Sequence, residues 1–170
     1  SDRRLAALFD ALQEIPHLRR IRIHTRLPVV LPERIDAGFL AAWSGVRLRK
    51  TVVVHANHAR EIDTSVRAAV AALRDAGSTV LNQSVLLRGV NDRSDDLVDL
   101  SEALFEAGVL PYYLHLLDPV AGAGHFDLPL TTARQLVAEV ATRLPGYLVP
   151  RLVREEPGAP AKTMVPPASR

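Results

Sequence analysis

Apolar and polar residues along the chain follow two periodicities, one typical of helices and one typical of strands. Near the N-terminus apolar residues recur three and four positions apart, as on one face of an amphipathic helix, and Pro16 closes this segment. Residues 20–24 then alternate between polar and apolar, as a half-buried strand does. Residues 51–55 contain the uninterrupted run Val52-Val53-Val54, which is typical of a parallel strand covered on both faces.

Strand and helix patterns continue to alternate through most of the remaining chain. Further strands are predicted over residues 78–83, 110–117 and 147–153, and further helices over residues 37–43, 63–76, 94–107 and 132–144. Gly77 and Gly108 follow two of these helices as typical C-caps, and Ser94 is a predicted N-cap. The prolines of residues 26–32 predict an extended loop there, and the glycines of residues 118–129 predict a second loop.

Five strands that alternate with helices at a spacing of roughly 25 to 35 residues indicate right-handed βαβ units and a parallel sheet. The fold class is therefore α/β. Because five units are too few for a closed eight-stranded barrel, we expect part of a barrel or an open sheet. Residues 1–154 are predicted to form these units, and residues 155–170 a Pro/Gly-rich tail. The first residue is Ser rather than Met, so we expect an upstream region to be missing.

The composition narrows the classes of function. A chain of 170 residues, 48% of them apolar, can bury the core of one domain. The formal net charge is only +2, and no run of like charges indicates binding to nucleic acid or to a membrane surface. Because the chain has neither an apolar stretch of roughly 20 residues nor a signal peptide, we expect a cytoplasmic protein. It has no cysteine, so its own residues cannot form disulfides or bind an iron–sulfur cluster through thiolates.

Polar residues follow the predicted strands at the point where each strand ends. They are His24, His55, Asn82, Gln83, His115, Asp118 and Glu155. Since the carboxyl ends of parallel strands form the functional edge of such folds, we expect these side chains to converge on one rim. A single histidine at a strand end more often forms a hydrogen bond to a loop than takes part in catalysis. The functional hypothesis therefore depends on several of these polar residues lying together. His55 and His58 resemble a metal-binding pair, but they lack an evident third ligand and no metal site is predicted.

Lys162 differs from the other basic residues, because only it and Lys50 are lysines among the 21 Lys and Arg residues. It lies in the tail just after the last predicted strand, where its side chain can point across the mouth of a barrel. A desolvated lysine amine loses its proton more readily and can form a Schiff base. The alternative is a solvated lysine with no role.

Several sequence segments resemble the lysine 2,3-aminomutase family, and together they cover the chain nearly end to end. These segments are Arg22-Ile-His-Thr-Arg-Leu-Pro-Val-Val-Leu-Pro, His55-Ala-Asn-His58, Asn82-Gln-Ser-Val-Leu-Leu-Arg-Gly-Val-Asn-Asp92, Pro111-Tyr-Tyr-Leu-His-Leu-Leu-Asp118 and Gly124-His-Phe126. Residues 144–150 of the tail, with Glu155 and Lys162, resemble the branch that makes (R)-β-lysine for elongation factor P modification. The resemblance implies the C-terminal part of a partial, six-unit, TIM-like (β/α) barrel of a radical S-adenosylmethionine enzyme.

The same resemblance implies three cofactors: pyridoxal phosphate, S-adenosylmethionine and a [4Fe–4S] cluster. Lys162 matches the lysine that binds pyridoxal phosphate covalently and is the implied catalytic residue. His115 matches a position beside that cofactor, where the enzymes of lysine catabolism have a tyrosine. His55 and Gln83 match residues on the S-adenosylmethionine side of the site.

The implied substrate is L-lysine. Asp118 and Glu155 match acidic residues that bind its side-chain amine, and such a carboxylate pair selects lysine over shorter or uncharged amino acids. The implied reaction converts L-α-lysine into (R)-β-lysine, with pyridoxal phosphate holding the migrating amine and a deoxyadenosyl radical abstracting hydrogen. The product connects the chain indirectly to the elongation factor P pathway, and assembly into a homo-oligomer is left open.

One departure from the family pattern limits this prediction. The CxxxCxxC motif that binds the cluster is absent, as is the first part of the barrel, so the cluster ligands are expected outside this chain and the chain alone is expected to be inactive. Two alternatives stay open. The first is a degenerate, non-enzymatic remnant that at most binds pyridoxal phosphate, for which exposed apolar sheet edges and aggregation are the expected signs. The second is an independent Schiff-base lyase or aldolase using Lys162, although such lysines usually lie on strands of complete barrels.

Overall fold

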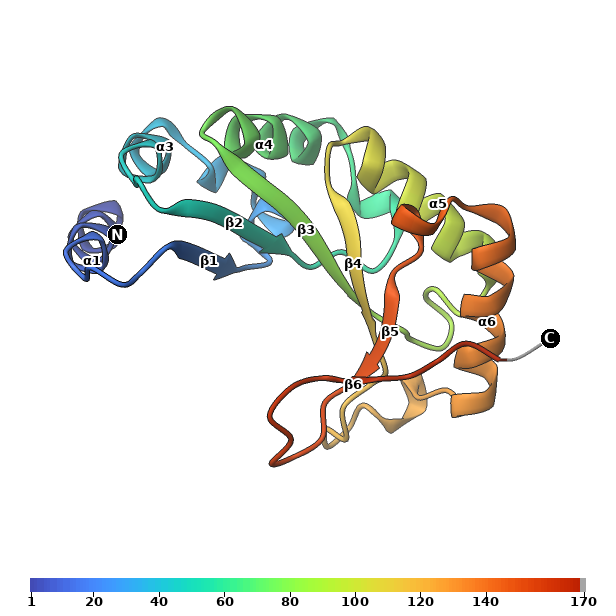
Figure 1. Ribbon diagram of the computed structural model, residues 1–170. Coiled ribbons are helices and arrows are strands. Elements are labelled where there is room, and N and C mark those ends of the chain that lie inside the picture. Colours follow the sequence, from blue (N-terminus) through green and yellow to red (C-terminus); the bar gives the residue numbers. More distant parts are fainter. Residues whose placement is uncertain (169–170) are drawn as a thin grey trace.

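The computed structural model describes residues 1–168 and shows a curled sheet with helices along its convex side (Figure 1). The sheet has six strands in chain order: β1 (Arg20–His24), β2 (Arg49–Val54), β3 (Ser78–Val85), β4 (Leu110–His115), β5 (Arg151–Arg154) and β6 (Thr163–Met164). The first five strands are parallel, and β6 runs antiparallel to β5. The predicted α/β class and the part-barrel architecture are confirmed.

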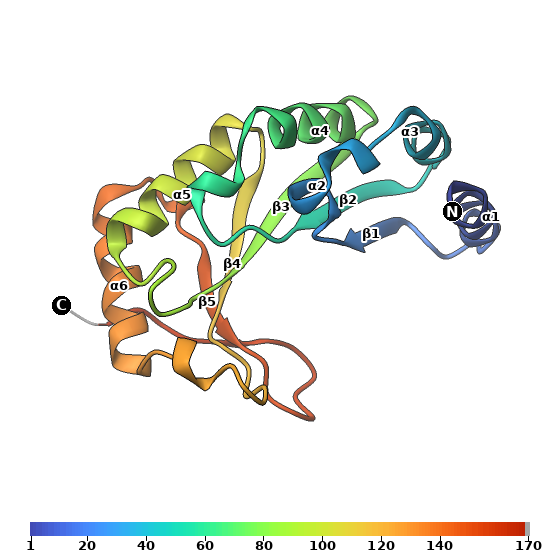
Figure 2. The same cartoon turned by 180° about the vertical axis from the view of Figure 1, so that it is seen from behind.

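Helices connect the strands and cover the sheet from outside, as Figure 2 shows from behind. They are α1 (Asp2–Gln13), α2 (Leu27–Val30), α3 (Ala37–Ser44), α4 (Thr64–Asp75), α5 (Ser94–Glu106) and α6 (Leu130–Arg143), with short 3-10 helices at Pro32–Arg34, Ala59–Glu61, Gly124–Phe126 and Gly146–Leu148. Two apolar clusters fill the space between helices and sheet, one including Trp43 and Leu73 and the other including Leu114 and Leu152. Within residues 1–168 no helix is long and apolar enough to cross a membrane.

Helix α4 shows how local sequence signals set an element. The Asp63 carboxylate accepts a hydrogen bond from the Val66 backbone N–H and so caps the helix at its N-terminus. Val66, Val70 and Leu73 are buried on the side that faces the core, at the spacing of one helix face. Gly77 ends the segment with a φ of 85°, in the left-handed region that favours glycine.

Two predicted segments differ from the structure near the first and fifth parallel strands. Residues 26–32 are not extended, because Pro28 lies in the first turn of the short helix α2, where its missing N–H is not needed. Residues 147–150 are not part of a strand. A 3-10 helix precedes β5 there, because Pro145 and Pro150 interrupt regular pairing on both sides of it.

One further prediction about an element end is also wrong. Ser94 is the first residue of α5 rather than its N-cap, and Arg93 occupies the cap position without a side-chain hydrogen bond. The Pro/Gly-rich tail contains a strand, because β6 pairs with β5. This pairing returns the tail across the mouth of the curled sheet (Figure 1) and places Lys162 near the strand ends.

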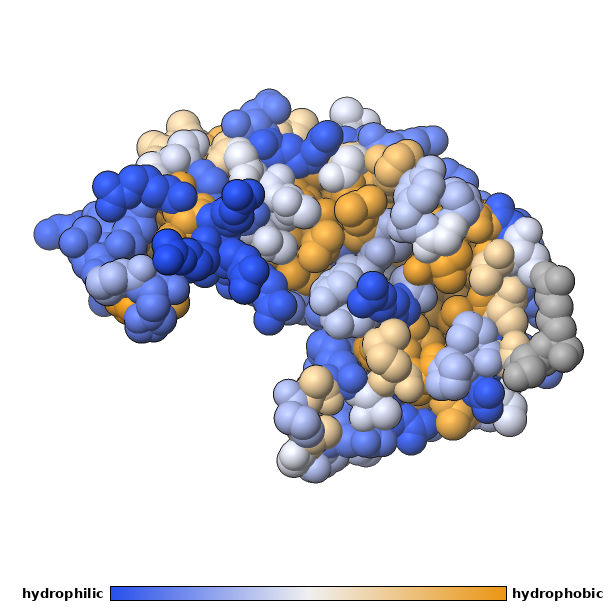
Figure 3. Space-filling view, viewed as in Figure 1, coloured by the Kyte–Doolittle hydropathy of each residue, from blue (hydrophilic) through white to orange (hydrophobic). Residues whose placement is uncertain are grey.

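The concave face near the open edge strand β1 is strongly basic. Ile21 and Ile23 of β1 pack into the core on the convex side, so the alternating Arg20 and Arg22 lie on the concave face and are exposed. Arg49 is the register partner of Arg20 on β2 and is also exposed. Figure 3 shows hydrophilic residues over β1 and β2 beside the hollow of the molecule. On its concave face, this edge of the half-barrel is charged rather than apolar.

Candidate functional site

The carboxyl ends of the parallel strands bring several of the predicted site residues together. His24 and His115 are the last residues of β1 and β4, and His55 directly follows β2. The rings of His24 and His55 lie edge to face, with centroids 6.1 Å apart. The charge of Lys162 acts on all three histidines. These four residues therefore share one edge of the sheet.

Lys162 reaches this edge because the tail folds back beside β5. Residues 155–162 link β5 to β6, and the antiparallel register makes Glu155 and Lys162 the next cross-strand neighbours. The Lys162 ammonium donates a hydrogen bond to the Glu155 carboxylate. It also lies 5.7 Å from the centre of the Tyr113 ring, within cation–π distance. The side chain of Lys162 is 25% exposed.

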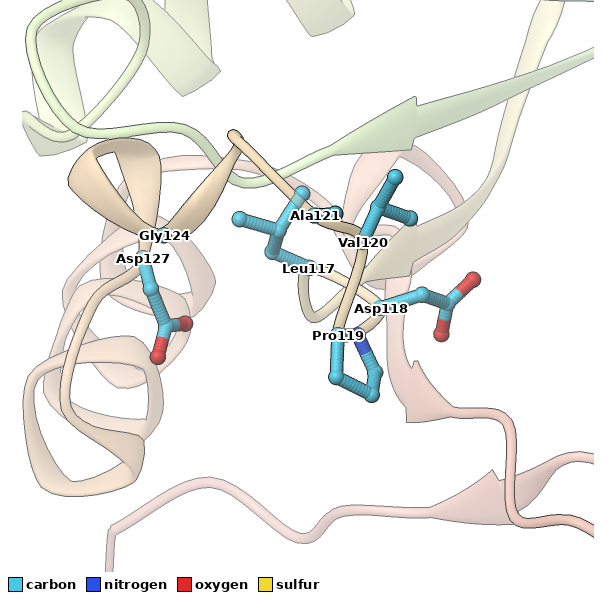
Figure 4. Close-up of a pocket in the computed structure, with 7 residues that line it drawn as sticks. All are labelled: Leu117, Asp118, Pro119, Val120, Ala121, Gly124 and Asp127. Carbon is cyan, nitrogen blue, oxygen red and sulfur yellow. The ribbon is translucent and has the colours of Figure 1, made fainter.

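Glu155 and Asp118 line a common cavity of about 400 Å³ beside the loop that follows β4. Asp118 also lines a neighbouring cavity of about 420 Å³, where Figure 4 shows its side chain and that of Asp127 at opposite ends. The hydrogen bond and the positive charge of Lys162 lower the pKa of Glu155, which is therefore ionised at neutral pH. The two predicted carboxylates thus share a cavity wall, but Glu155 already holds the ammonium of Lys162.

The histidines of this edge are neutral at neutral pH. The loss of surrounding solvent is the largest cause that lowers the pKa of His24, His55 and His115 below the ordinary value of 6.5, and the charge of Lys162 adds to it. For His115, the nearby carboxylates of Glu155 and Asp118 partly oppose this shift. A neutral imidazole can both donate and accept a hydrogen bond, so each ring can bind a polar ligand group.

Two of these imidazoles have a free polar atom that is buried. The Nε2 atoms of His55 and His115 have no hydrogen-bond partner within residues 1–168. Buried polar atoms in native structures nearly always have a partner. Because His115 is only 8% exposed and its ring lies near Lys162, a ligand held by the lysine can supply the missing partner.

Sequence reasoning missed Tyr112 and Tyr113 as site residues. The register of β3 against β4 shifts at a bulge that pairs Gln83 with Tyr113 and leaves Tyr112 as the extra residue. As a result, two consecutive tyrosines lie on the same side of the strand, with ring centroids 3.8 Å apart and hydroxyl oxygens 3.0 Å apart. The Tyr113 ring also meets His115 edge to face at 5.9 Å. The alternating pattern of the strand carries no signal of a bulge, so neither residue was a candidate.

Asn82 was expected on the rim, but it lies buried below it, with 1% of its surface exposed. Its amide oxygen accepts a hydrogen bond from the Ala56 N–H, and its amide nitrogen donates to the Ala56 carbonyl. These bonds fasten the loop after β2 and so fix the position of His55, one residue earlier. Asn82 therefore supports the site rather than lining it.

His58 has a structural role in the same loop. Its Nδ1 accepts a hydrogen bond from the Arg60 N–H, and the Glu61 carboxylate accepts one from the His58 N–H, which caps the 3-10 helix Ala59–Glu61. In the part of the chain that the structure describes, no three His, Asp or Glu residues are grouped as metal ligands. The position of His58 in the loop is accounted for by the cap that it forms.

Comparison with known proteins identifies relatives of this chain. No protein-family profile matches the chain. The chain is 51% identical over 162 residues to the L-lysine 2,3-aminomutase of Escherichia coli (strain K12), covering 95% of the chain and 47% of that protein. It is 49% identical over 163 residues to the protein of the same name from Haemophilus influenzae, covering 96% of the chain and 48% of that protein. For the Clostridium subterminale L-lysine 2,3-aminomutase the identity is 38% over 170 residues, covering 98% and 40%.

A solved structure supports the fold. The crystal structure of a radical SAM methyltransferase from Sphaerobacter thermophilus superposes with a TM-score of 0.53 over 79% of this chain and 40% of that chain, at 18% sequence identity. This likeness shows the part-barrel fold alone. The chain spans about half the length of the curated relatives it matches. By its sequence it belongs to the lysine 2,3-aminomutase family, as the counterpart of the C-terminal half of those relatives.

Proposed function

We propose that this chain forms the pyridoxal phosphate and lysine site of a lysine 2,3-aminomutase, which converts L-α-lysine into (R)-β-lysine for the modification of elongation factor P in the cytoplasm. The observation that carries the proposal is the position of Lys162 at the mouth of the half-barrel, against Glu155 and over the Tyr113 ring. In this proposal residues 1–154 form the barrel units, and the tail from residue 155 carries the cofactor lysine.

The residues around Lys162 fit pyridoxal phosphate. When bound, this cofactor supplies an aldehyde carbon that holds the amine of the substrate while the amine moves between neighbouring carbons. Lys162 provides the amine that anchors the aldehyde, and the Tyr113 ring provides an aromatic wall 5.7 Å from that amine. His115 presents a buried Nε2 without a partner, which can bond a polar atom of the cofactor.

Asp118 and Glu155 are proposed to bind the side-chain ammonium of the substrate. Both line one cavity, and the lowered pKa keeps Glu155 charged at neutral pH. Hydrogen bonds between ammonium and carboxylate groups are charge-assisted and stronger than those between neutral groups. An amino acid without a side-chain cation leaves the Asp118 carboxylate without a charge-assisted bond, so the site favours lysine.

The radical part of the reaction is only partly represented in this chain. His55 and Gln83 are proposed to lie on the S-adenosylmethionine side, where the free Nε2 of His55 can accept or donate one hydrogen bond. The chain has no cysteine, so its residues do not fit a [4Fe–4S] cluster bound by thiolates. We infer that the cluster ligands come from outside this chain and that the chain alone does not turn over lysine.

Reductive labelling tests the cofactor site. The chain is incubated with pyridoxal phosphate, reduced with borohydride and digested, and the adduct is mapped by mass spectrometry. We expect the label on Lys162. Lys50 is the matched internal control, because it is the other lysine of the chain and its ammonium donates to the Trp43 carbonyl at 3.1 Å on the outer side of the sheet. Labelling of Lys50 instead, or of neither lysine, contradicts the proposal and favours a remnant without a cofactor.

The substrate role of Asp118 has a separate test. Asp118→Asn keeps the shape of the side chain and removes its charge, so it should weaken the binding of L-lysine about tenfold or more, as the loss of a hydrogen bond to a charged group does. Labelling of Lys162 by pyridoxal phosphate should stay unchanged. Asp75→Asn is the control, because Asp75 is exposed at the end of α4 and lines neither cavity. Equal losses of lysine binding and cofactor labelling contradict the role given to Asp118.

A further inference from the structure

The pairing of β2 with β3 stops one residue before the S-adenosylmethionine side of the proposed site. The last register pair is Val54 with Asn82. Continued by one residue, the same register places His55 opposite Gln83, the two residues proposed to lie on that side. Their relative position therefore depends on contacts beyond the last backbone pair of the two strands.

Asn91 joins the two segments that continue past this pair. It lies in the loop after β3 and is completely buried, with 0% of its surface exposed. Its side-chain nitrogen donates to the Asn57 carbonyl at 2.8 Å and to the Val85 carbonyl at 3.0 Å. Its side-chain oxygen accepts a hydrogen bond from the Leu87 N–H at 2.8 Å. One buried amide therefore holds the loop after β2 against the end of β3.

These bonds lie close to both site residues. Asn57 follows His55 by two residues, and Val85 follows Gln83 by two. The Val85 N–H also donates to the Asn57 side-chain oxygen at 2.8 Å, so two side-chain amides join the same pair of residues. Buried hydrogen-bond networks whose members are all satisfied make a structure rigid. The amide of Asn91 thus continues the pairing of the two strands where their backbone register ends.

We propose that Asn91 is a positioning residue that keeps His55 opposite Gln83, so that both side chains contact one molecule of S-adenosylmethionine. The inference rests on the proposed function and adds to it the residue that sets this geometry. Because Asn91 is buried, it acts through the Asn57 and Val85 carbonyls rather than by contact with the ligand. The buried Nε2 of His55 has no partner within residues 1–168, and a ligand can bond it only if the ring is held in the right place.

Substitutions of Asn91 separate its donor from its acceptor. Asn91→Asp keeps an oxygen for the Leu87 N–H and replaces the donating nitrogen by an oxygen that faces two carbonyls. Asn91→Ala removes both functions without adding a charge. The matched control is Gln13→Glu, an amide-to-acid change outside the site that keeps the oxygen that accepts from the Arg47 N–H. Circular dichroism melting curves verify that each variant is folded.

Amide hydrogen exchange shows whether the two segments stay joined. In both Asn91 variants the Val85 N–H should exchange about tenfold or more faster than in the wild type, as expected when a buried hydrogen bond is lost. The Leu87 N–H should stay protected in Asn91→Asp and lose its protection in Asn91→Ala. Gln13→Glu should leave both amides unchanged. An unchanged exchange rate of the Val85 N–H in the two Asn91 variants contradicts the inference.

The contact between the His24 and His55 rings reports the position of His55 itself. The ring centroids lie 6.1 Å apart, so we expect a nuclear Overhauser effect between the ring protons in the wild type and in Gln13→Glu. The effect should be lost in Asn91→Asp and in Asn91→Ala. A merely structural role of Asn91 lowers the melting temperature and leaves the effect in the folded variants, and that result also overturns the inference.

Ligand binding separates this inference from the proposed function. Binding of radiolabelled S-adenosylmethionine to the full chain is measured by equilibrium dialysis. Asn91→Ala should weaken it about tenfold, while labelling of Lys162 by pyridoxal phosphate stays unchanged. Equal binding by the wild type and Asn91→Ala removes the positioning role and leaves the proposed function in place. If the wild type does not bind S-adenosylmethionine although Asn91→Ala loses the ring contact of His55, the positioning of His55 stands and the S-adenosylmethionine side of the proposed function fails.

Discussion

The lowered pKa values of the histidines at the carboxyl edge of the sheet make the stability of the chain depend on pH. Burial is the largest cause that lowers the pKa of His115 from 6.5, with the Lys162 charge as the next cause. The unfolded chain therefore binds a proton at a pH where folded His115 is still neutral. His24 and His55 shift in the same direction, so the three effects act together at the same edge.

We expect the thermal stability of the chain to fall as the pH decreases below 6.5. Because the folded-state pKa of His115 lies below 6.5, its contribution is complete above that value and is lost as the pH falls through the folded-state pKa. Melting temperatures are measured between about pH 8 and pH 5 for the wild type, His115→Gln and the exposed control His17→Gln. His115→Gln should reduce the fall in melting temperature between these pH values. In a chain of this size, each kcal/mol of pH-dependent stability that the variant removes corresponds to about 2 to 4 °C. Identical declines in the three proteins contradict this account.

The ends of helix α4, which depend on local chemistry, were predicted closely from the sequence. The helix predicted over residues 63–76 is Thr64–Asp75 in the structure, because Asp63 and Gly77 are local signals that act within one turn. The bulge at Tyr112 and the strand β6 depend on register between segments distant in the sequence, which the periodicity of one segment does not contain. For this reason the sequence predicted that Lys162 and Glu155 lie at the same edge of the sheet, but it did not predict that they pair with each other.

Gly108 allows a test of how these element ends stabilise the fold. It follows α5 with a φ of 79°, and a Cβ atom there meets the guanidinium of Arg74. Gly108→Ala should therefore lower the free energy of unfolding by about 1 to 2 kcal/mol. Gly146→Ala is the control, because its Cβ meets no atom within 4 Å, and it should change stability by less than about 0.5 kcal/mol. Urea unfolding measures both variants, and a cost at Gly146 that equals the cost at Gly108 contradicts the argument.

The molecule as a whole is an open half-barrel, and the polar residues on its two sides differ in kind. The carboxyl edge near β4, β5 and the tail holds Lys162, Glu155 and Asp118 near each other. Toward β1, the concave face carries exposed arginines, and β1 is the edge strand of the sheet. The sequence predicted part of a barrel from the number of its strands, but it did not predict a charged inner face, since that depends on which way each arginine points. The residues proposed to bind cofactor and substrate therefore lie at one end of the sheet.

The proposed separation of cofactor binding from radical generation can be tested on the isolated chain. Iron–sulfur clusters of this class are held by cysteine thiolates, and the chain contains none, so the isolated chain should bind pyridoxal phosphate at Lys162 but form no β-lysine. It is incubated without oxygen with L-lysine, pyridoxal phosphate, S-adenosylmethionine, ferrous iron, sulfide and dithionite, and the amino acids are separated by chromatography. The Escherichia coli relative named L-lysine 2,3-aminomutase is the positive control under the same conditions. Labelling of Lys162 in the same preparation shows that the site is intact, so absence of product then reflects the missing radical source. Formation of β-lysine by the isolated chain means that it obtains a radical without a thiolate-bound cluster, and it contradicts the division of roles argued from the structure.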